Sequence, residues 1–212
     1  MESLLTLHKI RDRQMLPYEQ KKRGFDLLFS VFALLLLTPI IPLIAIITKL
    51  SSSGPVLYKQ ERIGRNGNPF ILYKFRSMVE NAEEHGPALS SKNDPRVTVW
   101  GRFMRRYKLD EIPQFYNCLV GDMSVVGPRP ERAYWQQKIE ERCSQFRLLQ
   151  ELKPGMTSLG QVKFGYAENV DEMRLRLRYD LLYLNQASFS TDLRILWETM
   201  IVIVRGKNSS IR

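Results

Sequence analysis

An uncharged apolar run from Leu27 to Thr48 constrains this chain more than any other feature of its sequence. A helix needs about 20 apolar residues to cross the hydrocarbon core of a bilayer, and this run has that length. A secretory signal does not fit, because the run is too long and no small-residue cleavage site follows it. The run therefore predicts a membrane-embedded helix over about residues 24–50.

Basic residues flank this run on both sides. They are Lys21, Lys22 and Arg23 before it and Lys49, Lys59, Arg62 and Arg65 after it. Since positive charge marks the cytoplasmic flank of a membrane segment, both ends favour the cytoplasmic face. Near the middle lie Thr38 and Pro39, where the proline removes a hydrogen bond and bends the helix. A re-entrant helix that breaks there satisfies both observations, and a spanning helix with a tolerated proline kink is the alternative.

The chain is strongly basic, with 32 Lys and Arg against 22 Asp and Glu and a net charge of +10. Such an excess favours an anionic partner, which could be nucleic acid, an anionic lipid surface or phosphorylated small molecules. We expect no nucleic acid, because the aromatic residues do not interleave with the basic ones as a stacking platform requires. The lipid bilayer and a phosphorylated substrate are the expected partners.

The length of 212 residues favours one domain over two. We expect residues 1–20 to form a separate and poorly ordered N-terminal segment, with an amphipathic helix on lipid as the alternative. Residues 21–212 are expected to form the single domain, which includes the membrane helix.

A β-hairpin is predicted directly after the membrane segment. Residues 56–63 and 70–75 are short strand-like runs, and the residues between them, 64–68, tolerate positive φ. One hairpin is marginal by itself, so it must pack on helices or lipid.

The remaining elements are expected to be helical. Helices are predicted over residues 77–88, 133–152 and from Asn169, which starts a capping-box-like sequence, to about 185. In the last segment, apolar residues recur with helical spacing at Leu193, Leu196, Trp197, Met200, Ile201 and Val204. This stripe faces the core, lies on the membrane plane or serves a homodimer. The fold class predicted is α+β and mainly helical, a compact cytoplasmic domain with a small β-hairpin, anchored by the re-entrant helix and by surface amphipathic helices.

Two adjacent carboxylates, Asp110 and Glu111, open a predicted helix that has Pro113 in its first turn. The positive end of a helix lowers the pKa of a carboxylate and attracts phosphate. The sequence therefore marks Asp110 and Glu111 as candidate catalytic residues. A plain capping aspartate beside a solvated glutamate is the alternative.

Cations cluster around this pair in the sequence. Arg102 and Arg105 share one helical face, and Arg129 is held on a stiff backbone between Pro128 and Pro130. Forked arginine donors suit phosphate oxygens. The predicted phosphate-binding residues are Arg129, Arg102, Arg105, Lys74 and Arg76. The alternative for the arginine pair is a solvated basic face, or a basic face that touches lipid headgroups.

Five segments, in order, resemble the bacterial sugar transferases of the monotopic phosphoglycosyl transferase family. They are the apolar segment with its central Thr38-Pro39, GPVLYKQERIGRNGNPFILYKFRSM, DPRVTVWGRFMRRYKLDEIPQFYNCLVGDMSVVGPRPE, LKPGMTSLGQV and YDLLYLNQASFSTDLRIL. Each is a modest signal alone, but five in the same order form a strong one, and the resemblance covers nearly everything from Lys21 to Lys207.

The resemblance implies a reaction. Such enzymes transfer a phosphosugar from a UDP-sugar to polyprenyl (undecaprenyl) phosphate at the cytoplasmic face of the bacterial inner membrane, and release UMP. The family's Asp-Glu pair matches Asp110 and Glu111, which implies that Asp110 forms a covalent aspartyl phosphosugar and binds an assisting Mg²⁺. The role of Glu111 stays open between holding the metal and taking a proton from the acceptor.

Two other functions remain as alternatives. One is a membrane-anchored, non-catalytic binder of an anionic polymer, and the other is a nucleotide-sugar hydrolase that uses water. The resemblance does not identify the sugar.

Overall fold

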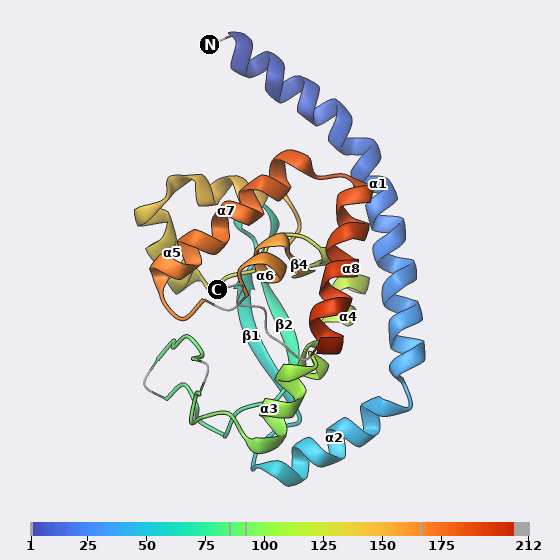
Figure 1. Cartoon of the computed structure of the whole chain (residues 1–212), viewed down its shortest axis with the longest axis vertical. Coiled ribbons are helices and arrows are strands. Elements are labelled where there is room, and N and C mark those ends of the chain that lie inside the picture. Colours follow the sequence, from blue (N-terminus) through green and yellow to red (C-terminus); the bar gives the residue numbers. More distant parts are fainter. Residues whose placement is uncertain (1, 85, 92, 166, 206–212) are drawn as a thin grey trace.

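The computed structural model describes residues 2–84, 86–91, 93–165 and 167–205, with side chains from Tyr18 onward. It combines eight α-helices among the described residues with two small sheets, so the predicted α+β, mainly helical class is confirmed (Figure 1). The helices are α1 Glu2–Leu37, α2 Ile40–Ser51, α3 Val99–Arg106, α4 Gln114–Val120, α5 Ala133–Arg142, α6 Leu159–Lys163, α7 Val170–Gln186 and α8 Phe189–Arg205. The strands are β1 Leu57–Ile63, β2 Pro69–Phe75, β3 Ser124–Val126 and β4 Gly155–Thr157.

The predicted break at Thr38 and Pro39 is present. There α1 ends and α2 begins at an angle of 67°. The hydroxyl of Thr38 donates to the carbonyl of Leu34 at 2.7 Å, one turn earlier. Among the described helices, none by itself is long and apolar enough to cross a bilayer, whereas the bent pair together has the required length and composition.

The N-terminal part of the chain differs from the expectation. Residues 2–20, expected to be poorly ordered, are helical and continuous with the rest of α1. Further along, α1 is fixed to the domain by Arg23, which donates to the carbonyls of Cys118 and Leu119 at the end of α4. One turn later, Asp26 is buried and accepts hydrogen bonds from β3. This attachment leaves the apolar face of α1 exposed beyond Asp26, as at Leu28 and Phe32.

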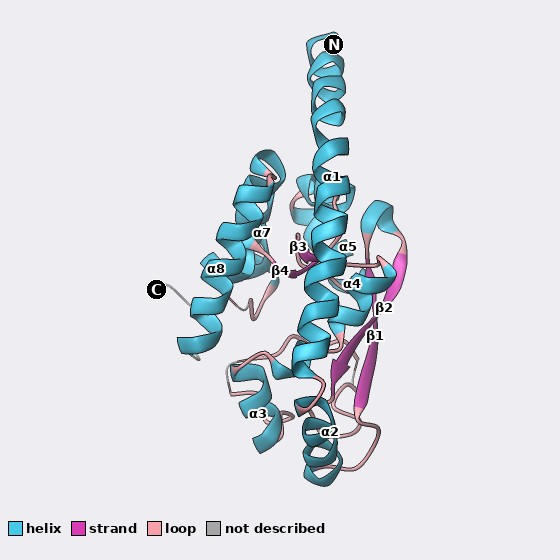
Figure 2. Ribbon diagram, turned by 90° about the vertical axis from the view of Figure 1, so that its right-hand side faces the viewer, coloured by secondary structure: helices cyan, strands magenta, loops and turns pink. Residues whose placement is uncertain are grey.

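The predicted hairpin is confirmed. Strands β1 and β2 pair antiparallel from Leu57 opposite Phe75 to Ile63 opposite Pro69. A 3₁₀ turn, Arg65–Gly67, joins them, and Asn66 there has a φ of 58°. A second sheet was not predicted. It pairs β3 in parallel with β4 and lies between α1 and α8 (Figure 2).

Two predicted helices are wrong in whole or in part. Residues 77–84 and 86–88 form turns and loop, because Met78 bridges Val97 and the guanidinium of Arg96 donates to the carbonyls of Ala82 and Leu89. The helix predicted over 133–152 ends at Arg142 and is followed by a 3₁₀ segment, Ser144–Glu151. Cys143 separates the two, since its φ of −153° is not helical.

The start predicted for α7 is confirmed, because the side chain of Asn169 accepts a hydrogen bond from the backbone N–H of Glu172. Arg176 of this helix is buried and forms an ion pair with Glu131. This pair connects α7 to the end of the Gly127–Glu131 loop.

Candidate active site

Asp110 and Glu111 lie in a 3₁₀ turn, Leu109–Glu111, rather than at the start of a helix. The preceding residue, Lys108, has a φ of 59°, and Pro113 occupies the N-cap position of α4. The prediction that Asp110 caps a helix is therefore wrong. The turn is held in place by Ile112, which is buried in a hydrophobic cluster with residues of α2, α3 and β2.

Asp110 is buried, and its Oδ1 has no hydrogen-bond partner within the described part of the chain. Burial, and then repulsion from Glu111, raise the pKa of this carboxyl above its usual value, although Lys74 opposes the rise. The low pKa expected for Asp110 from a helix terminus is thus wrong. A buried carboxylate oxygen without a hydrogen-bond partner is costly, which marks Oδ1 as a place where a ligand would be stabilising.

Glu111 has the opposite environment. Its carboxylate lies 3.3 Å from Nζ of Lys74, 3.7 Å from Nζ of Lys108 and 3.9 Å from Nη1 of Arg129. Burial raises the pKa of Glu111, but these three cations outweigh it and hold the pKa well below the usual range. Glu111 is therefore ionised at neutral pH.

The burial of these charges also changes the pKa of Lys74. Burial lowers the pKa of its ammonium group to about 8, although the Glu111 carboxylate favours the charged form. Arg129 adds to the lowering by like-charge repulsion. Lys74 is thus largely charged at neutral pH and loses its charge as the pH rises above 8.

A basic cleft of about 310 Å³ opens beside the turn and includes Asp110 in its wall. Four of the five predicted phosphate-binding residues line it, namely Lys74, Arg76, Arg105 and Arg129. The fifth, Arg102, is exposed, donates to the carbonyl of Val97 and is not part of the cleft lining.

The four lining residues differ in how they are engaged. The guanidinium of Arg76 bonds the carbonyls of Thr48, Ser52 and Pro55, so it fixes the end of α2 and the chain that follows. Arg105 donates to the hydroxyls of Ser77 and Ser90. These contacts give Arg76 a structural function in addition to its position in the cleft wall.

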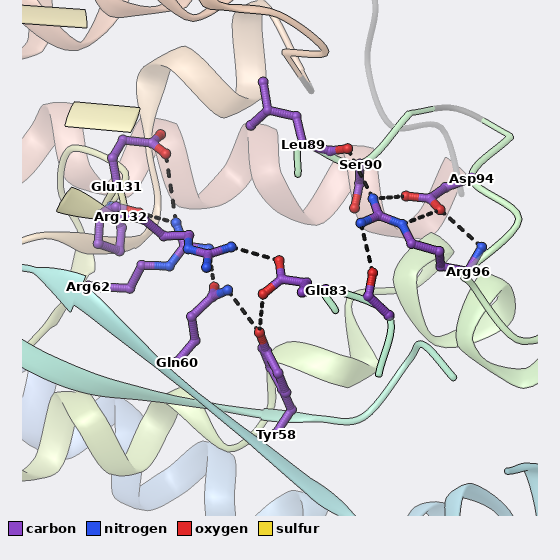
Figure 3. Close-up of polar contacts among 12 residues, drawn as sticks. Tyr58, Gln60, Arg62, Glu83, Leu89, Ser90, Asp94, Arg96, Glu131 and Arg132 are labelled. Carbon is purple, nitrogen blue, oxygen red and sulfur yellow. Dashed lines mark hydrogen bonds and ion pairs between the residues drawn. The ribbon is translucent and has the colours of Figure 1, made fainter. Parts of the chain in front are cut away.

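The cleft is also lined by residues that the sequence did not predict as part of the site. Arg132 donates to Glu83 at 2.6 Å, and Tyr58 donates to the other oxygen of Glu83 at 3.0 Å (Figure 3). Gln60 then donates to Tyr58, and Arg62 donates to Gln60. The network fixes the loop that carries Glu83 to the hairpin. The sequence signal that could have pointed to this network is the short PRPER sequence, which ends at Arg132.

An apolar groove of about 740 Å³ lies on the other side of the turn, between α1 and α8. Phe29 and Phe32 of α1 and Trp197 and Met200 of α8 contribute to its walls. Its charged lining residues are Lys108, Glu111 and Arg129. Arg129 lines both the basic cleft and the apolar groove. The two cavities therefore meet at the pair Asp110 and Glu111, which is called the dyad below.

The site fits a metal ion bound mainly through substrate. No cluster of three or more His, Cys, Asp or Glu side chains suited to a metal occurs among the described residues. Magnesium often takes only one or two carboxylates and fills its remaining positions with phosphate oxygens and water. The partnerless Oδ1 of Asp110 is one such ligand.

Comparison with known proteins identifies the family. The family model described as bacterial sugar transferase matches residues 17–206. This chain belongs to the bacterial sugar transferase family. The predicted resemblance is thus confirmed, and the match extends from α1 to the end of α8.

Curated relatives of this bacterial sugar transferase carry related names. The chain is 36% identical over 203 residues to a UDP-N-acetylgalactosamine-undecaprenyl-phosphate N-acetylgalactosaminephosphotransferase of Aeromonas hydrophila, covering 94% of this chain and 48% of that protein. It is 39% identical over 181 residues to a UDP-glucose:undecaprenyl-phosphate glucose-1-phosphate transferase of Klebsiella pneumoniae, covering 84% and 39%. An exopolysaccharide production protein of Rhizobium leguminosarum bv. phaseoli is 39% identical over 193 residues, with 88% and 96% covered. The chain therefore spans about half or less of the first two relatives, whose names specify different sugars.

Proposed function

We propose that this bacterial sugar transferase moves a phosphosugar from a UDP-sugar to polyprenyl phosphate, releasing UMP and forming a polyprenyl diphosphate sugar. The observation that carries the proposal is Asp110, whose buried and partnerless Oδ1 lies in the wall of a basic cleft. The names of the relatives support the reaction class, because they specify undecaprenyl phosphate and nucleotide-linked sugars.

In the first step, an oxygen of ionised Asp110 attacks the sugar-linked phosphorus of the donor. The bond from this phosphorus to the oxygen that bridges the two phosphates breaks, and UMP leaves with the electron pair. A covalent aspartyl phosphosugar remains. The raised pKa of Asp110 makes its carboxylate a stronger nucleophile once it is ionised.

In the second step, an oxygen of the polyprenyl phosphate attacks the same phosphorus. The acyl phosphate bond breaks, and Asp110 is released as a carboxylate. Dividing the transfer in this way lets the water-soluble nucleotide depart before the lipid reacts.

The cations of the cleft offset the charge on the phosphates in both steps. Lys74, Arg105 and Arg129 lie in the cleft wall with Asp110. Positioned cations are the main catalytic contribution that a protein makes to phosphoryl transfer. Bound Mg²⁺, with Asp110 Oδ1 as its protein ligand, would neutralise the phosphate oxygens and favour departure of UMP.

We further propose that α1 and α2 enter the bacterial inner membrane from the cytoplasmic face and return to it. The support is the 67° bend between two apolar helices and the basic residues at both flanks. The dyad then lies at the height of a lipid phosphate.

The reaction is tested by incubating purified protein with UDP-N-acetylgalactosamine or UDP-glucose, Mg²⁺ and undecaprenyl phosphate, followed by assay of UMP and lipid-linked sugar. We expect lipid-linked product and UMP in equal amounts. Sustained release of free sugar phosphate without lipid would instead indicate the hydrolase alternative. Donor binding without turnover would favour the non-catalytic binder.

A further inference from the structure

The apolar groove has walls that expose an unusual amount of hydrophobic surface. On α1, Phe32 is 64% exposed and Leu36 is 63% exposed. On α8, Trp197 is 69% exposed and Met200 is 54% exposed. Groups of large exposed apolar side chains mark lipid or partner binding rather than ordinary surface.

Helix α8 runs beside α1, and polar contacts hold the two together near the start of α8 (Figure 1). Tyr18 and Lys22 of α1 both donate hydrogen bonds to the carboxylate of Asp192 on α8, which is buried. The groove lies further along both helices, and its lining includes Ala33 on α1 and Met200 on α8. The walls are thus parts of rigid helices, which suits a preformed site.

Among the described residues that line the groove, the charged ones are Lys108, Glu111 and Arg129. Lys108 and Glu111 belong to the turn that carries Asp110, and Arg129 also lines the basic cleft on the other side. An occupant with a long apolar body and an anionic head matches this distribution of polarity. Because the two cavities meet at the dyad, such a head would approach Asp110 from the side opposite the cleft.

We propose that the groove binds the polyprenyl chain of the acceptor, with the acceptor phosphate at the end formed by Lys108 and Arg129. This inference rests on the proposed function and adds the location of the lipid substrate. It assigns the basic cleft to the nucleotide-sugar donor and the apolar groove to the acceptor. The two substrates therefore reach the same aspartate from different cavities.

Two other occupants share part of this chemistry. Bilayer phospholipids also combine apolar chains with a phosphate, and the exposed face of α8 could pack against a second copy of this chain. The charged end beside the dyad favours a phosphate-bearing lipid over a helix from another copy. The experiment below separates the three.

Substitutions that fill the groove test the proposal, and each has a matched control on the same helix. Met200→Trp enlarges a half-exposed groove residue, and Val204→Trp makes a similar change one turn later, outside the lining. Ala33→Phe fills the groove from α1, and Leu35→Phe enlarges an exposed residue on another face of that helix. The Met200 variant removes no buried contact of the core, so it separates loss of binding from loss of folding.

We expect the two groove variants to raise KM for undecaprenyl phosphate about tenfold, the effect of losing burial of roughly two methylene groups. KM for the UDP-sugar, measured by UMP release, should match that of wild type. The two control variants should keep wild-type KM values for both substrates. If the groove variants and controls have the same KM for the lipid, the groove does not bind the acceptor chain.

A photoreactive polyprenyl phosphate provides a readout that does not depend on turnover. We expect it to label peptides of α1 and α8, and undecaprenyl phosphate to displace it at concentrations where phosphatidylglycerol does not. Equal displacement by phosphatidylglycerol would assign the groove to bilayer lipid. Labelling elsewhere, together with a wild-type dimer that dissociates to a monomer in Met200→Trp, would assign the groove to a second copy of this chain. If wild type transfers no sugar phosphate but the groove is labelled specifically, the proposed reaction fails and the lipid site remains.

Discussion

Asp110 and Glu111 are neighbours in the chain, yet Asp110 lines the basic cleft and Glu111 lines the apolar groove. The electrostatic environments of the two carboxylates also differ. Glu111 has three cations within 3.9 Å, whereas Oδ1 of Asp110 has no hydrogen-bond partner in the described structure. The negative charge of Glu111 in turn helps to raise the pKa of Asp110. Two carboxylates with such different surroundings are suited to different functions.

The effect of Glu111 on Asp110 can be measured. In Glu111→Gln, the repulsion that raises the pKa of Asp110 is lost, so the acidic limb of the pH profile for UMP release should move to lower pH. Glu61→Gln, on an exposed part of β1, is the control and should leave the limb in place. A limb that stays fixed or moves to higher pH in Glu111→Gln would show that Asp110 does not control it.

The buried pair of Arg176 and Glu131 should contribute strongly to stability. Within the described part of the chain, Arg176→Met leaves the buried Glu131 carboxylate with Arg62, at 3.7 Å, as its remaining ion-pair partner. We expect a loss of about 3 kcal/mol in the free energy of unfolding, measured with denaturant in detergent micelles. The double variant Arg176→Met with Glu131→Gln should recover most of that loss.

The exposed pair of Arg142 and Asp171 is the matched control, because both side chains are at least half exposed. Arg142→Met should cost less than about 1 kcal/mol. If Arg142→Met and Arg176→Met lose the same free energy of unfolding, burial does not make the Arg176–Glu131 pair more important for stability.

Asp180 should make stability depend on pH. Burial raises its pKa to about 6 from an ordinary 3.8, although Arg176 opposes the rise. The folded state therefore binds more protons than the unfolded state between these values, and stability falls as the pH rises through this window, by up to about 3 kcal/mol. In Asp180→Asn, which keeps an acceptor for the N–H of Gly160, this part of the pH dependence should disappear. The test is a comparison of unfolding free energies at pH 4 and pH 7, and an unchanged slope would show that Asp180 titrates normally.

The proposed membrane topology depends on the break at Pro39. The proposal places both ends of the α1–α2 pair at the cytoplasmic face, so single cysteines at positions 20 and 52 should both be protected from an impermeant thiol reagent added outside intact cells. Labelling at one position alone would indicate a spanning helix. Replacing Pro39 with Leu should favour the straight form and expose one end, whereas Pro42→Leu, already within α2, should not.

Local signals explain which elements could be predicted from the sequence. The hairpin follows from turn residues beside two strand-like runs, and the start of α7 follows from Asn169 and Glu172. The break at Thr38-Pro39 follows from the chemistry of proline. Each of these is decided within a few residues, so no knowledge of the remaining fold is needed.

Long-range contacts explain the failures. The β3–β4 pairing joins Ser124 to Gly155, and no short pattern predicts strands of three residues. The loop in place of the helix expected over 77–88 depends on contacts with Arg96 and, across 49 residues, with Arg132. The environment of Asp110 was missed for the same reason, because its pKa depends on burial rather than on a helix terminus.

The most direct test of the central claim is mass analysis of the protein after incubation with a UDP-sugar and Mg²⁺ in the absence of lipid acceptor. We predict a peptide containing Asp110 that carries the mass of one phosphosugar, equimolar release of UMP, and loss of the adduct when undecaprenyl phosphate is added. Asp110→Asn should give neither adduct nor UMP. An adduct on another residue, or release of UMP only when the lipid is present, would contradict the covalent mechanism on Asp110.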